Sequence, residues 1–401
     1  MEESRPQLEL ADVIRAHGQE FLESVGVSAT LDQRRVLRQL ADCRTAALGG
    51  HLEKCSDCDH LRIAYDSCRS RYCPKCQGSS RRKWFDAREA DLLPVEYFHV
   101  VFTLPQEIAT LALQNKRVLY QLLFRASAET LRQIAADPKH LGAEIGFLSV
   151  LHTWGQTLTH HPHVHCVVPG GGLSPDRSRW ISCPKGFFLP VRVLSSVFRG
   201  KFLERLKDAH DKGELAFYGK LQHLSDPATF RSYLAATYKT NWVVYAKPPF
   251  GGPEQVLKYL ARYTHRVAIS NRRILSLQDG KVSFSWKDYA KGGQRRVMTL
   301  DAVEFLRRFL LHVLPKGFVR LRHYGLLSNR ARRAKLQLCR ELLGADAPSQ
   351  PVSDQSATET EEHGGMHCPA CKRGRMVAVM KVLRDRSPAT QWPSPQILKA
   401  G

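Results

Sequence analysis

The sequence lacks an uninterrupted run of about 18 apolar residues, the length at which a segment becomes a candidate membrane-spanning helix. It also lacks a secretory signal, because the first residues, MEESRPQLELADV, are acidic and polar where a signal peptide would be basic and then apolar. No internal repeat is visible, which argues against a repeat array. We therefore expect a globular chain that stays in the cytosol and has no membrane segment.

Acidic residues are much fewer than basic ones. The chain of 401 residues has 38 Asp and Glu against 60 Lys and Arg, which gives a formal net charge of +22. Solubility of a small domain needs a net charge of only about 2 to 8, so the excess indicates a polyanionic partner. Nucleic acid is the first such partner to consider, and a membrane surface is the second. With 43% hydrophobic residues, the chain can bury a core and is long enough for more than one domain.

The cysteines favour metal binding over disulfides, because their number is odd, 11, and six of them pair at two-residue gaps in a chain expected to be intracellular. Two Cys-x-x-Cys pairs that stand 14 residues apart have nearly the spacing of a four-thiolate zinc site. They predict one structural Zn²⁺ bound by Cys55, Cys58, Cys73 and Cys76. Further potential ligands are Cys43, His51 and Cys68, so a second zinc ion or a different set of four stays open.

Basic residues flank these cysteines and would suit contacts to DNA phosphates. They are Arg69, Arg71, Arg81, Arg82 and Lys83. The alternative is a zinc site that only holds the fold together. A further pair, Cys368 and Cys371, supplies half a site, which His363 or His367 could complete; a disordered or vestigial knuckle is the other interpretation.

The pattern along the chain predicts an α+β organisation. Helices are expected over 7–40, 107–135, 191–210, 228–237, from Pro253 onward, and over 300–313 with Thr299 as its cap. Strands are expected over 97–102, 147–152, 163–168 and 241–246, and as a hairpin of 273–277 and 282–286 around an Asp-Gly turn. The expected domains are 1–40, a helical lead-in; 41–92, a zinc-binding module that contacts DNA; 93–345, a larger α+β domain; 346–365, a flexible linker without Lys or Arg; and 366–401, a short tail with a Cys-x-x-Cys knuckle.

Two histidines stand on either side of one apolar residue in THHPHVHCVVPGGG. On a strand, residues i and i+2 point to the same face, so His163 and His165 would place two imidazoles side by side at a separation that suits one divalent ion. A His-x-His in a chain with 17 histidines is common by chance, and the motif gains weight only in combination with a second one.

That second motif is a pair of tyrosines. Tyr259 and Tyr263 are four residues apart in the helix expected after Pro253, so both phenols would emerge from one face. Two aromatic side chains at this spacing also occur in ordinary helix packing. The charged neighbours Arg262 and Arg266 fit a surface that faces phosphate better than a core.

Together these motifs resemble the HUH endonucleases and, within them, the two-tyrosine rolling-circle transposases of the insertion sequence ninety-one family. The resemblance covers residues 40–345 and rests on CRTAALGGHLEKCSDC, SCRSRYCPKCQ, HPHVHCVVPGGG, LKYLARYTHRVAISNRRI and LPKGFVRLRHYGLLSNR. One departure is that the usual Asn-Arg-His before the third zinc cysteine is Ser-Arg-Tyr here, which leaves the four cysteines unaffected. The resemblance implies an HUH endonuclease-like antiparallel sheet flanked by helices, preceded by a small zinc-binding module.

The resemblance also implies the chemistry. His163 and His165 would bind Mg²⁺ or Mn²⁺, and Tyr259 and Tyr263 would attack the scissile phosphate and form a 5′-phosphotyrosine. Two imidazoles leave most of an octahedral shell open, and the candidates for a third protein ligand are His152, Gln156 and His265. The implied partners are single-stranded DNA at element ends, target DNA, and host replication or helicase factors, in a bacterial cytoplasm where the protein is nucleoid-associated.

The resemblance makes 93–345 the HUH transposase catalytic domain. Basic residues near its end can form a further DNA-binding face or a solvated helix: Arg320, Arg322, His323, Arg330, Arg332, Arg333 and Lys335. The competing functions are a non-catalytic zinc-dependent nucleic-acid-binding protein, an HUH replication initiator or relaxase, and a metal hydrolase that leaves a free 5′-phosphate. The CRTAALGG lead into the zinc module favours the transposase. The recognised end sequences, the order in which the tyrosines act and the oligomeric state stay open.

Overall fold

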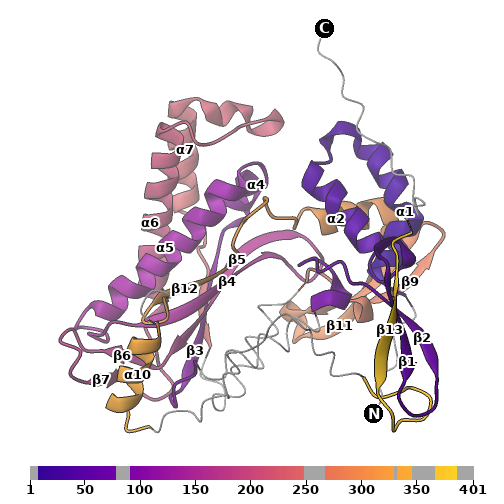
Figure 1. Ribbon diagram of the computed structural model, residues 1–401. Helices are drawn as coiled ribbons and strands as arrows, with labels where there is room; N and C mark the ends of the chain where they lie inside the picture. Colours follow the sequence, from indigo (N-terminus) through magenta and orange to yellow (C-terminus); the bar gives the residue numbers. More distant parts are fainter. Residues whose placement is uncertain (1–7, 78–90, 248–266, 329–331, 346–365, 386–401) are drawn as a thin grey trace. The chain divides into compact units, whose positions relative to one another are not determined.

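The computed structural model describes residues 8–77, 91–247, 267–328, 332–345 and 366–385, and the chain falls into two compact units (Figure 1). The terminal unit comprises 1–79, 267–313 and 351–401; the sheet unit comprises 80–266 and 314–350. This division differs from the contiguous domains expected from the sequence, since 267–313 associates with the two ends of the chain. Among the described residues, no helix is long and apolar enough to cross a membrane.

The helices of the terminal unit are α1 (Leu10–Val25), α2 (Leu31–Ala41) and α9 (Ala302–Leu310), and α1 packs against both of the others. The helical segment predicted over 7–40 is confirmed for most of its length, but it forms two helices. The chain breaks at Gly26, which has a φ of +51°. Thr30 then caps the start of α2. Its hydroxyl accepts a hydrogen bond from the backbone N–H of Gln33, and the Gln33 side chain accepts one from the backbone N–H of Thr30.

Two antiparallel sheets complete the terminal unit. One has the order β13-β1-β2, from β1 (Gly50–Cys55), β2 (Leu61–Tyr65) and β13 (Met376–Val382); the other has the order β11-β10-β9, from β9 (Ile274–Gln278), β10 (Lys281–Asp288) and β11 (Gln294–Asp301). The predicted Asp-Gly hairpin is confirmed, since Asp279 and Gly280 both have positive φ, 49° and 69°. The prediction that Thr299 caps a helix is wrong. Thr299 lies in β11, and its hydroxyl is 2.7 Å from that of Ser283 on the neighbouring strand.

The sheet unit is built on a five-stranded antiparallel sheet with β5 at its centre. Its order is β12-β4-β5-β3-β8, from β3 (Tyr97–Thr103), β4 (Gly146–Trp154), β5 (His160–Pro169), β8 (Val244–Lys247) and β12 (Leu321–Gly325). A short two-stranded sheet, β6 (Gly171–Leu173) and β7 (Trp180–Ser182), follows it. The strands predicted at 97–102, 147–152, 163–168 and 241–246 are confirmed within a few residues at their ends.

The helices of the sheet unit are α4 (Gln106–Gln114), α5 (Lys116–Ala136), α6 (Val191–Asp211), α7 (Pro227–Tyr238) and α10 (Arg332–Leu342). The predictions for 191–210 and 228–237 are confirmed. The helix predicted over 107–135 is two helices, because Asn115 has a φ of −118° and ψ of 40° between them. Its side-chain amide donates to the carbonyl of Ala216, and its side-chain oxygen accepts from the N–H of the same residue, which ties the break to a distant loop.

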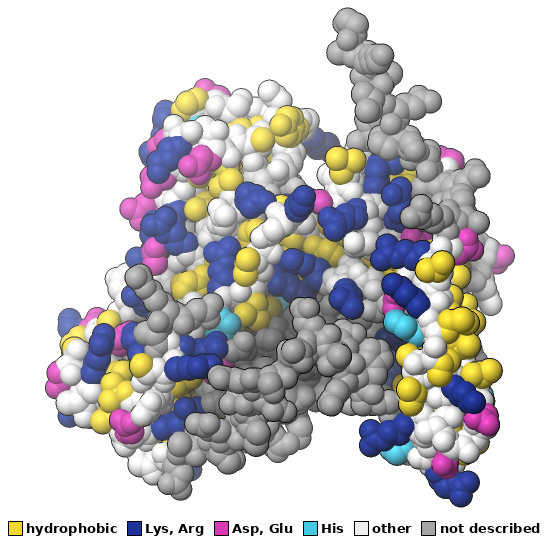
Figure 2. Space-filling model, in the orientation of Figure 1, with side chains coloured by type: hydrophobic (Ala, Val, Ile, Leu, Met, Phe, Trp, Pro, Cys, Tyr) yellow, Lys and Arg dark blue, Asp and Glu magenta, His cyan; other side chains and the backbone are white. Residues whose placement is uncertain are grey.

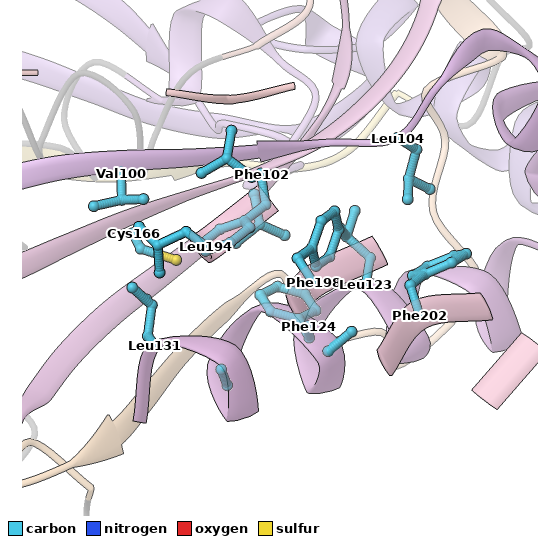
Figure 3. Packing of buried hydrophobic residues seen from close by; sticks show 14 of the residues in the cluster. Val100, Phe102, Leu104, Leu123, Phe124, Leu131, Cys166, Leu194, Phe198 and Phe202 are labelled. Carbon is cyan, nitrogen blue, oxygen red and sulfur yellow. The ribbon is translucent and has the colours of Figure 1, made fainter. Parts of the chain in front are cut away.

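The main core lies on one face of this sheet, where α5 and α6 cover it (Figure 3). Val100, Phe102 and Cys166 point from the strands toward Phe124 of α5 and Phe198 of α6, and all five side chains are fully buried. Because side chains alternate along a strand, the next residues of β3 and β5 face the other way. Those residues include the histidines, so packing of the core decides which face of the sheet carries them.

Candidate metal centres and the histidine site

Three histidines gather on the face of the sheet opposite this core. His163 and His165 lie on β5, and His152 lies on β4 directly across from His163 in the register. The ligand nitrogens of the three rings all lie within 4.8 Å of one another. His152 and His165 are buried and His163 is half-buried, so His163 is the most exposed of the three.

Hydrogen bonds at Nδ1 set the orientation of both motif rings. The Nδ1 of His163 lies 2.6 Å from the backbone oxygen of His161, and since a carbonyl only accepts, this nitrogen carries the proton. The Nδ1 of His165 lies 2.7 Å from Nε2 of His99, a buried residue of β3. Nε2 is then the ring nitrogen of His163 and of His165 that is positioned to bind a metal ion.

The structure thus brings together the two predicted histidines and one of the three candidates for a third ligand. His152 joins the group; Gln156 lies in the turn after β4; His265 lies outside the described residues. His99 was missed by sequence analysis, because nothing in its local sequence signals its role. Only the pairing of β3 with β5 brings it to His165.

The predicted nucleophiles Tyr259 and Tyr263 lie outside the described residues, as do Arg262 and Arg266. Among the residues that the structure does describe, three imidazoles in one group suit a divalent ion. Imidazole nitrogens favour first-row transition metals, whereas Mg²⁺ prefers oxygen ligands. Of the two ions expected from the sequence, Mn²⁺ therefore fits this donor set better.

The cysteines form two groups of four where the sequence predicted one site. The first group is Cys43, Cys68, Cys73 and Cys76; the second is Cys55, Cys58, Cys368 and Cys371. Nearest sulfur atoms are 3.6 Å apart in the first group and 3.7 Å apart in the second. None of these cysteines forms a disulfide. Of the four predicted ligands, Cys73 and Cys76 lie in the first group and Cys55 and Cys58 in the second. The predicted combination of four ligands in one site is therefore corrected.

The β1–β2 hairpin explains this correction. Cys55 and Cys58 lie at its turn, whereas Cys43 precedes it and Cys68 follows it at the other end. A strand rises about 3.3 Å per residue, so six residues of β1 separate the two ends by about 20 Å. The half-site predicted in the tail is completed by the cysteines of this turn. His51, at the other end of β1, is in neither group among the described residues, and His363 lies outside them.

The crowding of the thiols perturbs their ionisation. The pKa of Cys43 is lowered to about 7, chiefly because the thiols of Cys68 and Cys73 donate hydrogen bonds to it. The pKa of Cys371 is lowered to about 6 by hydrogen bonds from the backbone N–H groups of Gly374 and Arg373. The pKa of Cys58, Cys68 and Cys73 is instead raised, so each group contains thiols shifted in both directions. What suits each group to a cation such as Zn²⁺ is the gathering of four sulfur atoms at one point, since thiolate is a preferred zinc ligand.

A cavity of about 840 Å³ adjoins the first cysteine group in the terminal unit. Arg69, predicted to contact DNA, lines it together with Arg38, Lys381 and Arg384; the acidic residues in its wall are Asp42, Glu53 and Asp66. Burial raises the pKa of Asp42, whereas the charges of Arg38 and Arg15 oppose that shift. Figure 2 shows Lys and Arg side chains over the drawn faces of both units. Of the other predicted contacts, Arg71 is half-buried beside the cysteines, and Arg81, Arg82 and Lys83 lie outside the described residues.

Comparison with known proteins matches two family models to the chain. "Transposase zinc-binding domain" matches residues 13–104, and "Putative transposase" matches 146–335. The protein named "Putative transposase y4qJ" of Sinorhizobium fredii is 56% identical over 92% of this chain and 94% of its own length. The transposase for insertion sequence element IS801 of Pseudomonas savastanoi pv. phaseolicola is 26% identical over 75% of this chain and 71% of its own.

Solved structures give a weaker likeness. A conjugative relaxase, TrwC, in complex with oriT DNA is 16% identical and aligns over 62% of this chain and 72% of that one, with a TM-score of 0.24. A score this low carries no conclusion about this chain.

The sequence matches define a transposase, an enzyme class whose substrate is DNA, with a zinc-binding domain at its N-terminal end. The chain belongs to the IS91 family of transposases.

Proposed function

We propose that this transposase nicks single-stranded DNA at element ends by tyrosine attack, holds the cut strand as a 5′-phosphotyrosine and transfers it in rolling-circle transposition. The observation that carries the proposal is the group formed by His152, His163 and His165 in a chain of a transposase family. The histidines stand on the central strands of a rigid sheet, where strand register fixes their spacing.

The proposed nucleophiles are Tyr259 and Tyr263. In the first step a phenol oxygen bonds to the scissile phosphorus, the bond from phosphorus to the 3′ oxygen breaks, and that oxygen takes a proton to become a free 3′-hydroxyl. In the second step a 3′-hydroxyl attacks the phosphotyrosine and the phenol leaves with a proton. One phosphate ester replaces another in each step, so no nucleotide cofactor is needed. A second tyrosine allows a second cut while the first strand end stays attached.

The residues that would hold a divalent ion are His152, His163 through Nε2, and His165 through Nε2. When bound, the ion supplies positive charge at the scissile phosphate, which makes the phosphorus more reactive toward a weak nucleophile. This help matters because the ordinary pKa of a tyrosine phenol is about 10, so little phenolate exists at neutral pH. The protein's own contribution is orientation: His99 and the His161 carbonyl fix the two motif rings.

The test incubates the full chain with labelled single-stranded DNA from the element ends and Mn²⁺, and examines the products on a denaturing gel and by mass spectrometry. We expect a covalent adduct between a tyrosine and a DNA 5′ end. The adduct should disappear in the double variant Tyr259→Phe/Tyr263→Phe and fall at least 100-fold in His163→Ala/His165→Ala, as expected when electrostatic help at a phosphate is lost.

Two matched controls keep this test specific. Tyr289→Phe removes a phenol that is 69% exposed in the terminal unit, and His140→Ala removes an exposed histidine of the sheet unit. Both should nick like the parent protein. Cleavage without an adduct would contradict tyrosine attack and favour a hydrolase. Tight DNA binding without cleavage on every end sequence would favour the non-catalytic alternative.

A further inference from the structure

The second cysteine group joins residues from the two ends of the chain. Cys58 and Cys368 are 310 residues apart in sequence, yet their sulfur atoms are 3.7 Å apart, and the same distance separates Cys55 from Cys371. Tetrahedral zinc with Zn–S bonds of about 2.3 Å places its sulfur ligands about 3.8 Å from one another. A disulfide would need about 2.0 Å. The spacing is therefore that of four thiolates around one zinc ion.

The two halves of this group have the same local geometry. In the first, the N–H of Cys55 donates to the carbonyl of His60, and the N–H of Asp57 donates to the Cys55 sulfur at 3.3 Å. The residue that follows the second cysteine, Asp59, has a φ of +58°. Each of these contacts closes a tight turn that aims two thiols toward one point.

The second half repeats this pattern. The N–H of Cys368 donates to the carbonyl of Gly374, and the N–H of Ala370, two residues after Cys368, donates to the Cys368 sulfur. Lys372, which follows the second cysteine, has a φ of +61°. Two such turns face each other across four sulfur atoms, one from the N-terminal and one from the C-terminal part of the chain.

Backbone hydrogen bonds hold the C-terminal segment, but few of its side chains are buried. β13 pairs with β1 along its length, from Gly50 opposite Val382 to Cys55 opposite Met376. However, most side chains of β13 are exposed, Val377 and Val379 each to 54%. The buried cluster at this point consists of Cys55, Cys368 and Met376. So few buried apolar groups offset little of the entropy of ordering the segment, and a metal ion bound by the four thiolates would add a further link.

We propose that Cys55, Cys58, Cys368 and Cys371 bind a second structural zinc ion that fastens the C-terminal strand to the N-terminal zinc-binding module. The first ion is held by the group that contains Cys43 and Cys68. β13 and the residues after it bring Lys381 and Arg384 to the wall of the basic cavity, so the second zinc also sets the charge of that cavity.

Cobalt substitution of the full chain distinguishes this site from the histidine group, because only thiolate ligands give an intense sulfur-to-cobalt absorption in the near ultraviolet. We expect the double variant Cys368→Ser/Cys371→Ser to keep half of the absorption per chain of the parent protein. The matched control is Cys339→Ser, which removes a buried cysteine outside both groups and should keep all of it. Unchanged absorption in the double variant would overturn the proposal.

A glycine substitution tests the same site without removing a ligand. A Cβ on Gly374 would lie 2.5 Å from the Cys55 sulfur and 2.6 Å from Cβ of Asp57, so Gly374→Ala must push the two turns apart. Gly200→Ala, in α6, meets nothing within 4 Å and is the control. We expect the affinity of the second site for cobalt to fall at least tenfold in Gly374→Ala and to stay unchanged in Gly200→Ala. Equal affinity in the two variants would contradict the geometry.

Hydrogen exchange separates loss of this zinc from general unfolding. In Cys368→Ser/Cys371→Ser, the amides of β13 should exchange at least tenfold faster, while those of β4 and β5 in the sheet unit keep their protection. A β13 that stays protected would show that zinc does not fasten it and would overturn the proposal.

Discussion

The contact between His99 and His165 allows the sharpest test of the histidine site. Replacing His99 by Leu leaves a residue of similar bulk but removes the nitrogen that lies 2.7 Å from His165 Nδ1. His99 is buried, with 3% of its surface exposed, so water cannot easily take its place. A buried N–H that loses its acceptor costs about 1–3 kcal/mol.

That cost falls on the metal-bound state, because the ion requires Nε2 of His165 as ligand and hence the proton on Nδ1. Loss of a group that orients a metal-binding histidine typically lowers metal affinity about 10- to 100-fold, or about 1.4–2.7 kcal/mol. We therefore expect His99→Leu to weaken Mn²⁺ binding by that factor. His99→Gln, whose side-chain oxygen can accept the same hydrogen bond, should recover part of the affinity.

The measurement is a Mn²⁺ titration followed by electron paramagnetic resonance, on proteins whose melting temperatures agree within a few degrees. His152→Ala, which removes a proposed ligand, provides the upper reference for the loss, and His140→Ala the lower one. If His99→Leu bound Mn²⁺ like the parent protein, the orientation argument would be refuted. If Leu and Gln were equally weak, the effect would lie in packing and not in the hydrogen bond.

Two further predictions concern stability and DNA binding. Burial, and after it the positive charge of Lys116, lowers the pKa of His160 from 6.5 to about 4. The unfolded chain therefore binds a proton at a higher pH than the folded protein does, and the free energy of unfolding falls as the pH drops from 6.5 toward 4. The expected loss between pH 7.5 and pH 5 is about 2 kcal/mol. Urea unfolding should show this loss reduced in His160→Gln, and an equal loss in both proteins would contradict the assignment. Arg38 and Arg69 line the cavity, and the double variant Arg38→Ala/Arg69→Ala tests whether they contact DNA. In a plot of log affinity for single-stranded DNA against log salt concentration, the slope should become shallower by about 0.7 for each phosphate that the protein no longer neutralises. Lys212→Ala, which removes an exposed charge elsewhere, is the control. An unchanged slope would remove these arginines from the DNA interface.

Local sequence spacing predicted what depends on neighbours in the chain. Alternation along a strand places His163 and His165 on one face whatever the rest of the fold does, and the Asp279-Gly280 turn forms its hairpin because both residues tolerate positive φ. Cys-x-x-Cys likewise produces a turn with two converging thiols. These features need no long-range information, and sequence analysis found all of them. Local spacing failed where a break such as Asn115 depends on a hydrogen bond to the distant Ala216.

Strand pairing decided the rest. His152 and His99 reach the motif because β4 and β3 flank β5 in a particular register, and a register is chosen by the burial of whole strands against α5 and α6. The nearest Cys-x-x-Cys pairs in sequence fall into different groups, since they lie at opposite ends of the β1–β2 hairpin, whose strand β1 is about 20 Å long. The thiols that do meet come together because β13 adds to β1 after the chain has passed through the entire sheet unit. Residue types and spacings determined which chemical groups this protein has available. Only the tertiary structure decided which of those residues lie together, because packing of the whole fold sets the distances between segments far apart in sequence.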